Sequence, residues 1–85
     1  MSPSGPPDAE APAAQVLDLS GLKCPLPALR TRKALRRLPA GERLAVTATD
    51  PLARLDIPHA ATSEGAVVEE EQQAGPAVTF LLRKL

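Results

Sequence analysis

Hydrophobic residues recur along this chain at two different spacings, and these spacings predict alternating strands and helices. Residues 15–19 (QVLDL) have the pattern of a short strand, which Ser20-Gly21 ends. From Pro25 to about Leu38, positions three or four residues apart share one face of a predicted helix. These positions are Ala28, Thr31, Leu35 and Leu38. Pro39-Ala40-Gly41 is expected to end this helix, with Gly41 as a left-handed cap.

The alternation continues in the second half of the chain. Residues 43–49 (RLAVTAT) form a predicted strand in which every second residue faces a core. Those residues are Leu44, Val46 and Ala48. Asp50-Pro51 predicts a helix start, with Asp50 as the N-cap and proline at the first helical position. Ile57-Pro58 is expected to interrupt this helix, and Asp56 to cap a second short turn that reaches about Ser63.

Two strand-like runs, residues 66–72 (AVVEEEQ) and 77–83 (AVTFLLR), close the chain. Gly75-Pro76 lies between them, and this composition between two strands indicates a hairpin. The predicted order is therefore β-α-β-α-β-β. Two helices cannot cover both faces of a four-stranded sheet well, so we predict an α+β fold. It is a two-layer α/β sandwich in which two helices cover one face of a mixed four-stranded sheet.

Composition restricts the class of protein. The chain has 85 residues, a formal net charge of zero and one aromatic residue, Phe80, which argues against direct nucleic-acid binding. Residues 1–14 are rich in proline and alanine and lack a signal-peptide pattern, so we expect a disordered tail followed by one domain over residues 15–85. No apolar run is long enough to span a bilayer. The single cysteine cannot form an intrachain disulfide, and a free thiol leads us to expect the reducing cytoplasm. Nothing in the sequence demands more than a monomer, so we expect a monomer.

That cysteine, Cys24, stands in the sequence LKCPLP, just before the first predicted helix. A residue that precedes proline avoids the helical conformation, so Cys24 is expected at the N-cap. Pro25 and Pro27 then occupy the first turn, where neither removes a helix hydrogen bond, and predict a stiff turn with the thiol at its tip. The helix dipole and the neighbouring Lys23 predict a pKa for Cys24 below about 8.5. The alternative is that Cys24 is a small buried hydrophobic residue without a reactive role.

CPLP at the start of the first helix resembles the Cys-Pro-x-Pro motif of the TusA/SirA-type sulfur carriers. Four segments between Gln15 and Leu85 resemble that family in the same order: LDLSGLKCPLP, RKALRRLPAGERLAV, TDPLARLDIP and TFLLRKL. The resemblance implies a sulfurtransferase that carries sulfane sulfur as a persulfide on Cys24. Pro25 and Pro27 would be the rigid frame of this thiol, and Gly21 and Asp50 would help to position it.

The resemblance also implies partners. A cysteine desulfurase or a rhodanese-like protein would load Cys24, and an acceptor protein would use the sulfur for tRNA thiolation, molybdoenzyme maturation or sulfur oxidation. In some relatives the partner is a membrane thiosulfate transporter. Some members carry another cysteine after Asp-Ile-Pro, where this chain has His59-Ala60-Ala61, so its single thiol can pass sulfur only to another molecule. We expect no organic cofactor and no metal, since the sequence has no Cys/His cluster and no Gly-rich phosphate loop.

Several charged residues have two interpretations. The first helix and its flanks hold seven of the chain's ten cations. These cations form either a solvated helix face or a docking surface for an acidic partner. The residues expected to dock are Lys23, Arg30, Lys33, Arg36 and Arg37. Asp50 is an N-cap or a neighbour of the thiol, whose pKa it would raise. His59 is a surface residue or one half of a Cys–His pair, and Glu69-Glu70-Glu71 indicates an exposed edge strand.

Two other functions stay open from the sequence. One is a regulatory or binding module that docks through the basic first helix and does not use its thiol. The other is a thiol redox sensor, in which peroxide would oxidise Cys24.

Overall fold

The structure, a computed structural model, describes residues 14–85. The tail predicted over residues 1–14 lies outside this part, apart from Ala14. The elements are β1 (Gln15–Leu19), α2 (Leu26–Arg37), β2 (Arg43–Ala48), α3 (Ala53–Ser63), β3 (Ala66–Ala74) and β4 (Ala77–Lys84). Their order confirms the predicted β-α-β-α-β-β succession.

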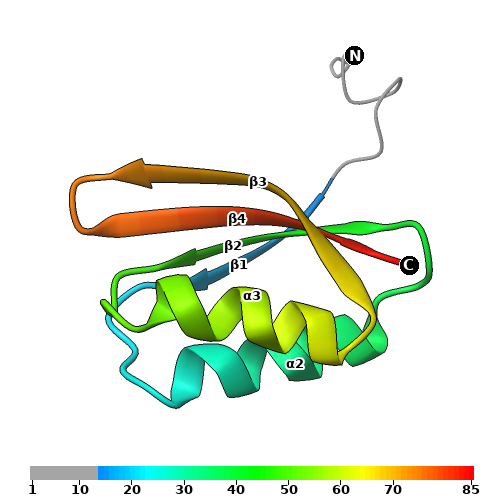
Figure 1. Cartoon of the computed structure of the whole chain (residues 1–85), viewed down its shortest axis with the longest axis horizontal. Helices are drawn as coiled ribbons and strands as arrows, with labels where there is room; N and C mark the ends of the chain where they lie inside the picture. The colour runs from blue at the N-terminus through cyan, green and yellow to red at the C-terminus, as the bar shows by residue number, and fades with distance from the viewer. Residues whose placement is uncertain (1–13) are drawn as a thin grey trace, which may run out of the picture.

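The strands form one four-stranded mixed sheet in the order β1-β2-β4-β3. β1 pairs with β2 in parallel, and the other two pairings are antiparallel. Figure 1 shows both helices on the same side of this sheet, which confirms the predicted two-layer architecture. Because β1 and β2 are parallel, the turns that follow them lie at the same end of the sheet, beyond the carboxyl ends of both strands, at the left in Figure 1.

The core lies between the helices and the covered face of the sheet. Leu44, Val46 and Ala48 are buried on that face, as their alternation predicts. Phe80 in β4 pairs with Val46 and is fully buried beside it. From α2, the predicted face contributes Thr31 and Leu35 to this core. The pattern of hydrophobic and polar residues therefore determines which side of each of these elements faces the core.

Helix α3 differs from the prediction, because it runs without interruption from Ala53 to Ser63 and contains Pro58. Proline lacks the N–H that would bond one turn back, which normally disfavours a helix interior. Four residues of α3 are buried against the sheet and hold the helix together across this position: Ala53, Ile57, Ala60 and Ala61. Asp56 therefore lies inside one helix and does not cap a second turn.

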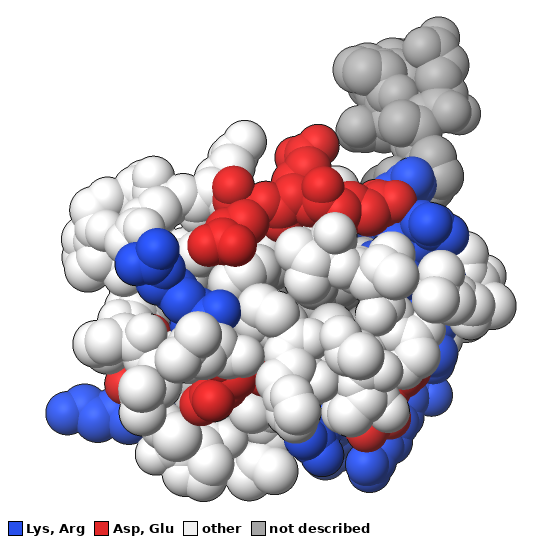
Figure 2. Space-filling model, viewed as in Figure 1, with Lys and Arg blue, Asp and Glu red and all other residues white. Residues whose placement is uncertain are grey.

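The hairpin of β3 and β4 is confirmed, with Gly75 in the left-handed region at φ 59°. β3 is an edge strand and is exposed over most of its length, as the run Glu69-Glu70-Glu71 predicts. Glu69 accepts hydrogen bonds at 2.7 Å from both Arg43 and Arg83. Figure 2 shows a group of acidic side chains over β3, and basic side chains at the left, the right and the bottom of the view. No helix within residues 14–85 is long and apolar enough to cross a membrane.

Candidate functional site

Cys24 lies in the connection between β1 and α2, and its side chain is exposed. Two hydrogen bonds shape this connection. The Leu22 N–H donates to the Leu19 carbonyl at 3.1 Å, and the Gly21 N–H donates to Thr49 Oγ1 at 2.9 Å. Gly21 adopts φ 84°, a conformation that favours glycine. The thiol is therefore presented on a loop that is tied to the end of β2.

The turn that follows Cys24 differs from the prediction by one residue. Pro25 is the N-cap of α2, with φ −98° and ψ 13°, and Leu26 is the first helical residue. Cys24 thus precedes the N-cap, and its bond to Pro25 is a cis peptide. The Leu26 N–H donates to the Lys23 carbonyl at 2.8 Å, so a turn closes around the thiol before the helix begins. Pro27 follows in the first turn of α2 and is buried.

The thiol has a carboxylate as its hydrogen-bond partner. Cys24 Sγ donates to Asp56 Oδ2, with 3.4 Å between the two atoms. This bond raises the pKa of Cys24, and desolvation and the negative charges of Asp56 and Asp50 raise it further. The prediction of a lowered pKa is therefore wrong, because two nearby carboxylates outweigh the helix dipole and Lys23. The exposed position agrees with a reactive thiol and not with a buried hydrophobic one.

Asp50 does not act as the predicted N-cap. The N-cap of α3 is Leu52, and no side chain caps this helix. The backbone carbonyl of Asp50 accepts from the Ala53 N–H at 3.0 Å, so Asp50 begins a turn that precedes the helix. Its Oδ2 is buried and has no hydrogen-bond partner in the described part of the chain. What Asp50 contributes at the thiol is its charge.

A shallow hollow of about 380 Å³ adjoins the thiol between the two helices. Its lining residues are Cys24, Pro25, Ala28, Leu29, Arg32, Asp56 and His59. Pro25, Ala28, Leu29 and Arg32 fall at the i, i+3, i+4 and i+7 positions, which form one stripe at the start of α2 beside α3. Leu29 is 54% exposed on this stripe. The exposed thiol therefore adjoins a partly apolar hollow that also contains Arg32 and Asp56, and such a surface is suited to contact with a partner protein.

The predicted docking residues are not brought together in one place. Lys23 lies next to Cys24 and is exposed. Arg36 donates to both carboxylate oxygens of Glu64, at 3.0 and 2.9 Å. Its charge is therefore already paired within the domain. Arg30, Lys33 and Arg37 line a different hollow, which does not include the thiol. The basic helix therefore has several separate surfaces.

Three residues of the thiol site were not expected there from the sequence. Asp56, Arg32 and Leu29 all line the hollow beside Cys24. A sequence signal existed for Leu29, because an apolar residue outside the buried stripe of an amphipathic helix is unusual. His59 also lines this hollow, but the hydrogen-bond partner of the thiol is Asp56. The described residues contain no cluster of His, Cys, Asp or Glu that could hold a metal ion.

The fold and the site define a small α+β domain that presents one exposed thiol beside a partly apolar hollow. Residues 15–84 match the family described as Sulfurtransferase TusA. The chain therefore belongs to this family, and the match includes all six strands and helices.

Named relatives agree with the family. The chain is 41% identical over 70 residues to the Sulfur carrier protein TusA of Allochromatium vinosum, covering 82% of this chain and 92% of the relative. It is 39% identical over 70 residues to the Putative sulfur carrier protein YrkI of Bacillus subtilis, covering 82% and 93%. It is 38% identical over 68 residues to the Putative sulfur carrier protein YedF of Escherichia coli, covering 80% and 88%.

Proposed function

We propose that this chain is a sulfur carrier that holds sulfane sulfur as a persulfide on Cys24 and passes it from a donor protein to an acceptor protein. The observation that carries the proposal is the exposure of the single thiol at the tip of the connection before α2. Its family membership and the names of its relatives support the same function. A free thiol of this kind persists in a reducing compartment, so we place the carrier in the cytoplasm.

Loading is an exchange between a thiolate and a persulfide. The Cys24 thiolate attacks the terminal sulfur of the donor's persulfide, and the donor's sulfur–sulfur bond breaks as the new one forms. The donor cysteine leaves as a thiolate, and the terminal sulfur with its proton remains on Cys24. No external oxidant or reductant is needed, and delivery to the acceptor is the same exchange in the other direction.

The resting state of the thiol makes loading depend on the partner. Asp56 accepts the thiol proton in a hydrogen bond and holds the pKa of Cys24 above its ordinary value. A donor that brings a cation close to Asp56 would weaken this effect and favour the thiolate. We propose a cysteine desulfurase as this donor, with Lys23, Arg32 and the exposed Leu29 on the surface that meets it.

Intact mass spectrometry tests the proposal. The full chain is incubated with a cysteine desulfurase and cysteine, and we expect Cys24 to gain about 32 Da, the mass of one sulfur atom. The added mass should be removed by a thiol reductant and absent in Cys24→Ser. A chain that gains no sulfur from any desulfurase or rhodanese but forms sulfenic acid readily with peroxide would contradict carriage and indicate a redox sensor.

A further inference from the structure

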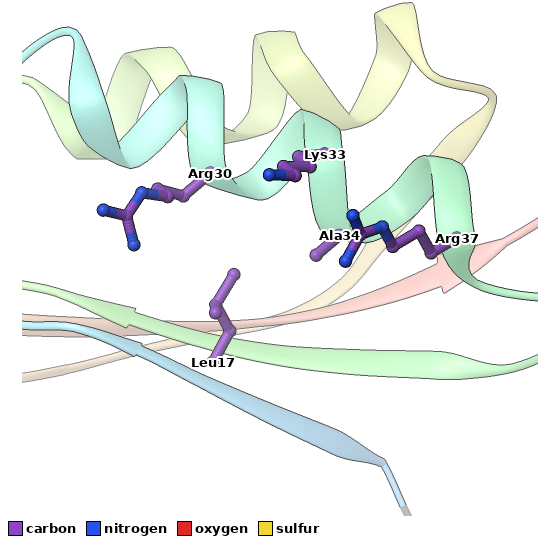
Figure 3. Close-up of a pocket in the computed structure, with 5 residues that line it drawn as sticks. All are labelled: Leu17, Arg30, Lys33, Ala34 and Arg37. Atoms are coloured by element: carbon purple, nitrogen blue, oxygen red, sulfur yellow. The ribbon is translucent and has the colours of Figure 1, made fainter.

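A second hollow, of about 360 Å³, lies between α2 and the edge strand β1. Leu17 points into it from β1, and Arg30, Lys33 and Arg37 extend along α2 above the strand (Figure 3). It shares no lining residue with the hollow at Cys24. It is therefore a separate surface with its own chemistry.

The three cations of this hollow have no acidic partner within the described chain. None of Arg30, Lys33 and Arg37 takes part in an ion pair there, whereas Arg36, Arg43 and Arg83 all do. Their spacing of three and four residues places them in one stripe that extends about 10 Å along the helix. A row of unpaired cations attracts a ligand with negative charges at a similar spacing.

Within residues 14–85, the strand below these cations has a free edge. In this part of the chain β1 ends the sheet and pairs only with β2, in a continuous register of all its residues. The opposite edge, β3, carries three glutamates in a row and a register shift between Val68 and Glu70, features that discourage pairing. β1 has no such shift, and its Val16 is 78% exposed on the uncovered face. Unpaired backbone groups on an edge of this kind can receive an extended peptide as a further strand.

We propose that an extended acidic segment of a partner protein binds as an additional strand beside β1, with its carboxylates against Arg30, Lys33 and Arg37. Side chains two residues apart in a strand share a face and are separated by about 7 Å. Two acidic residues at alternate positions therefore fit within the row of cations. The intervening apolar residues would lie on the other face, where Val16 is exposed. The thiol takes no part in this interaction, which is independent of sulfur carriage.

Binding of a defined probe to the full chain tests the role of charge. The probe is a short fluorescein-labelled peptide in which glutamate and valine alternate, and fluorescence anisotropy measures its affinity at low salt. We expect Arg30→Glu with Arg37→Glu to weaken binding by at least about tenfold. Arg30→Gln with Arg37→Gln should weaken it less and guards against a folding defect. Arg54→Glu, an exposed cation on α3 outside both of these hollows, is the matched control and should bind as the unaltered chain does.

Backbone methylation of the probe tests the added strand. Two peptides carry N-methyl groups at the odd or at the even positions, so that one of them loses the donors facing β1. We expect one peptide to lose at least about tenfold in affinity and the other to bind normally, since main-chain hydrogen bonds provide much of the affinity of an added strand. Amide resonances of residues 15–19 should shift on binding, and those of β3 should not. Equal binding of both methylated peptides would overturn the proposal and indicate attraction by charge alone.

Two further measurements separate this proposal from its competitors. Sedimentation of the chain alone should show no self-association that depends on Arg30 and Arg37, because such association would assign the surface to a second copy and overturn the proposal. Cys24→Ala should bind the probe as the unaltered chain does, since the hollow does not contain the thiol. A failure of peptide binding and a failure of sulfur loading are therefore independent results.

Discussion

The Cys24 thiol donates a hydrogen bond to the Asp56 carboxylate of helix α3, with 3.4 Å between Sγ and Oδ2. The two residues are 32 positions apart in the sequence and meet because α2 and α3 pack side by side on the sheet. The bond favours the protonated thiol. The free carrier therefore protects its nucleophile, and reactivity depends on what happens to Asp56 when a partner binds.

Removing the charge of Asp56 should activate the thiol. In Asp56→Asn, a neutral amide replaces the carboxylate that accepts from the thiol, which weakens the largest cause of the raised pKa of Cys24 and removes the charge of Asp56, so a larger fraction of the residue is thiolate at pH 7. Each unit by which the pKa falls increases the thiolate fraction about tenfold, and the rate rises about three- to fourfold per unit after the loss of intrinsic nucleophilicity. The rate of iodoacetamide alkylation at pH 7 measures this change. Glu70→Gln, on the distant edge strand, is the control, and equal rates in all three proteins would contradict the role of Asp56.

The same pKa shift predicts how stability depends on pH. A group whose pKa is higher in the folded state stabilises the fold below its unfolded pKa, and this contribution is lost as the pH rises through the folded pKa. For Cys24 the loss should begin near the unfolded pKa of a cysteine thiol, about 8.5, and continue as the pH rises above it. Urea unfolding from pH 7 to 11 should therefore show a steeper alkaline decrease for the unaltered chain than for Cys24→Ser. Parallel curves would show that the folded protein does not perturb the thiol.

A buried hydroxyl in the core offers a prediction about stability. Thr31 in α2 is fully buried, and its Oγ1 has no hydrogen-bond partner among residues 14–85. Thr31→Val replaces this hydroxyl by a methyl group of similar size, and we expect the free energy of unfolding to rise by about 1–2 kcal/mol. Thr31→Ser keeps the hydroxyl and loses the methyl group, so we expect a decrease of about 1 kcal/mol. Urea denaturation measures both changes, and a destabilised valine variant would mean that a buried water satisfies the hydroxyl.

The sequence predicts the fold well because its signals are local and repeated. Alternation in β2 and the helical spacing of Thr31 and Leu35 depend only on which side of an element is buried, and both were confirmed. The uninterrupted α3 could not be predicted in this way, since the burial of Ile57 against the sheet outweighs the local effect of Pro58. Tertiary burial of this kind has no signature within the helix itself.

The candidate site could be predicted only in part, for a related reason. The Cys-Pro-x-Pro sequence indicates an exposed thiol, and the parallel strands indicate that Asp50 lies near it. The direction of the pKa shift depends on Asp56, which reaches Cys24 through contacts between two helices. The spacing of hydrophobic residues describes one helix or strand at a time, so it does not reveal a contact between Cys24 and a residue of another helix. The division of the basic helix into paired and unpaired cations depends in the same way on Glu64, which follows α3.

The end of α2 is stabilised by a residue from the last strand. The sequence predicts Gly41 as a left-handed cap, and Gly41 does adopt φ 89°, but it lies beyond the C-cap residue, Leu38. Lys84 Nζ instead donates to the carbonyls of Leu35 and Leu38, at 2.6 and 3.2 Å. Both carbonyls lie at the end of the helix, where the Leu35 carbonyl also accepts from the Leu38 N–H at 3.1 Å, and a cation there also interacts favourably with the helix dipole.

Replacing Lys84 should therefore destabilise the domain more than its partly exposed position suggests. Lys84→Met keeps an unbranched, apolar side chain and removes both hydrogen bonds, and we expect a loss of about 1–2 kcal/mol in the free energy of unfolding. Hydrogen exchange should also become faster in the last turn of α2, because the helix end loses the two bonds from Lys84 that hold it to β4. Lys23→Met, at an exposed lysine without an ion pair in the described residues, is the matched control and should change stability little. If urea denaturation gives the same small change for both variants, α2 does not depend on Lys84, and water satisfies the carbonyls equally well.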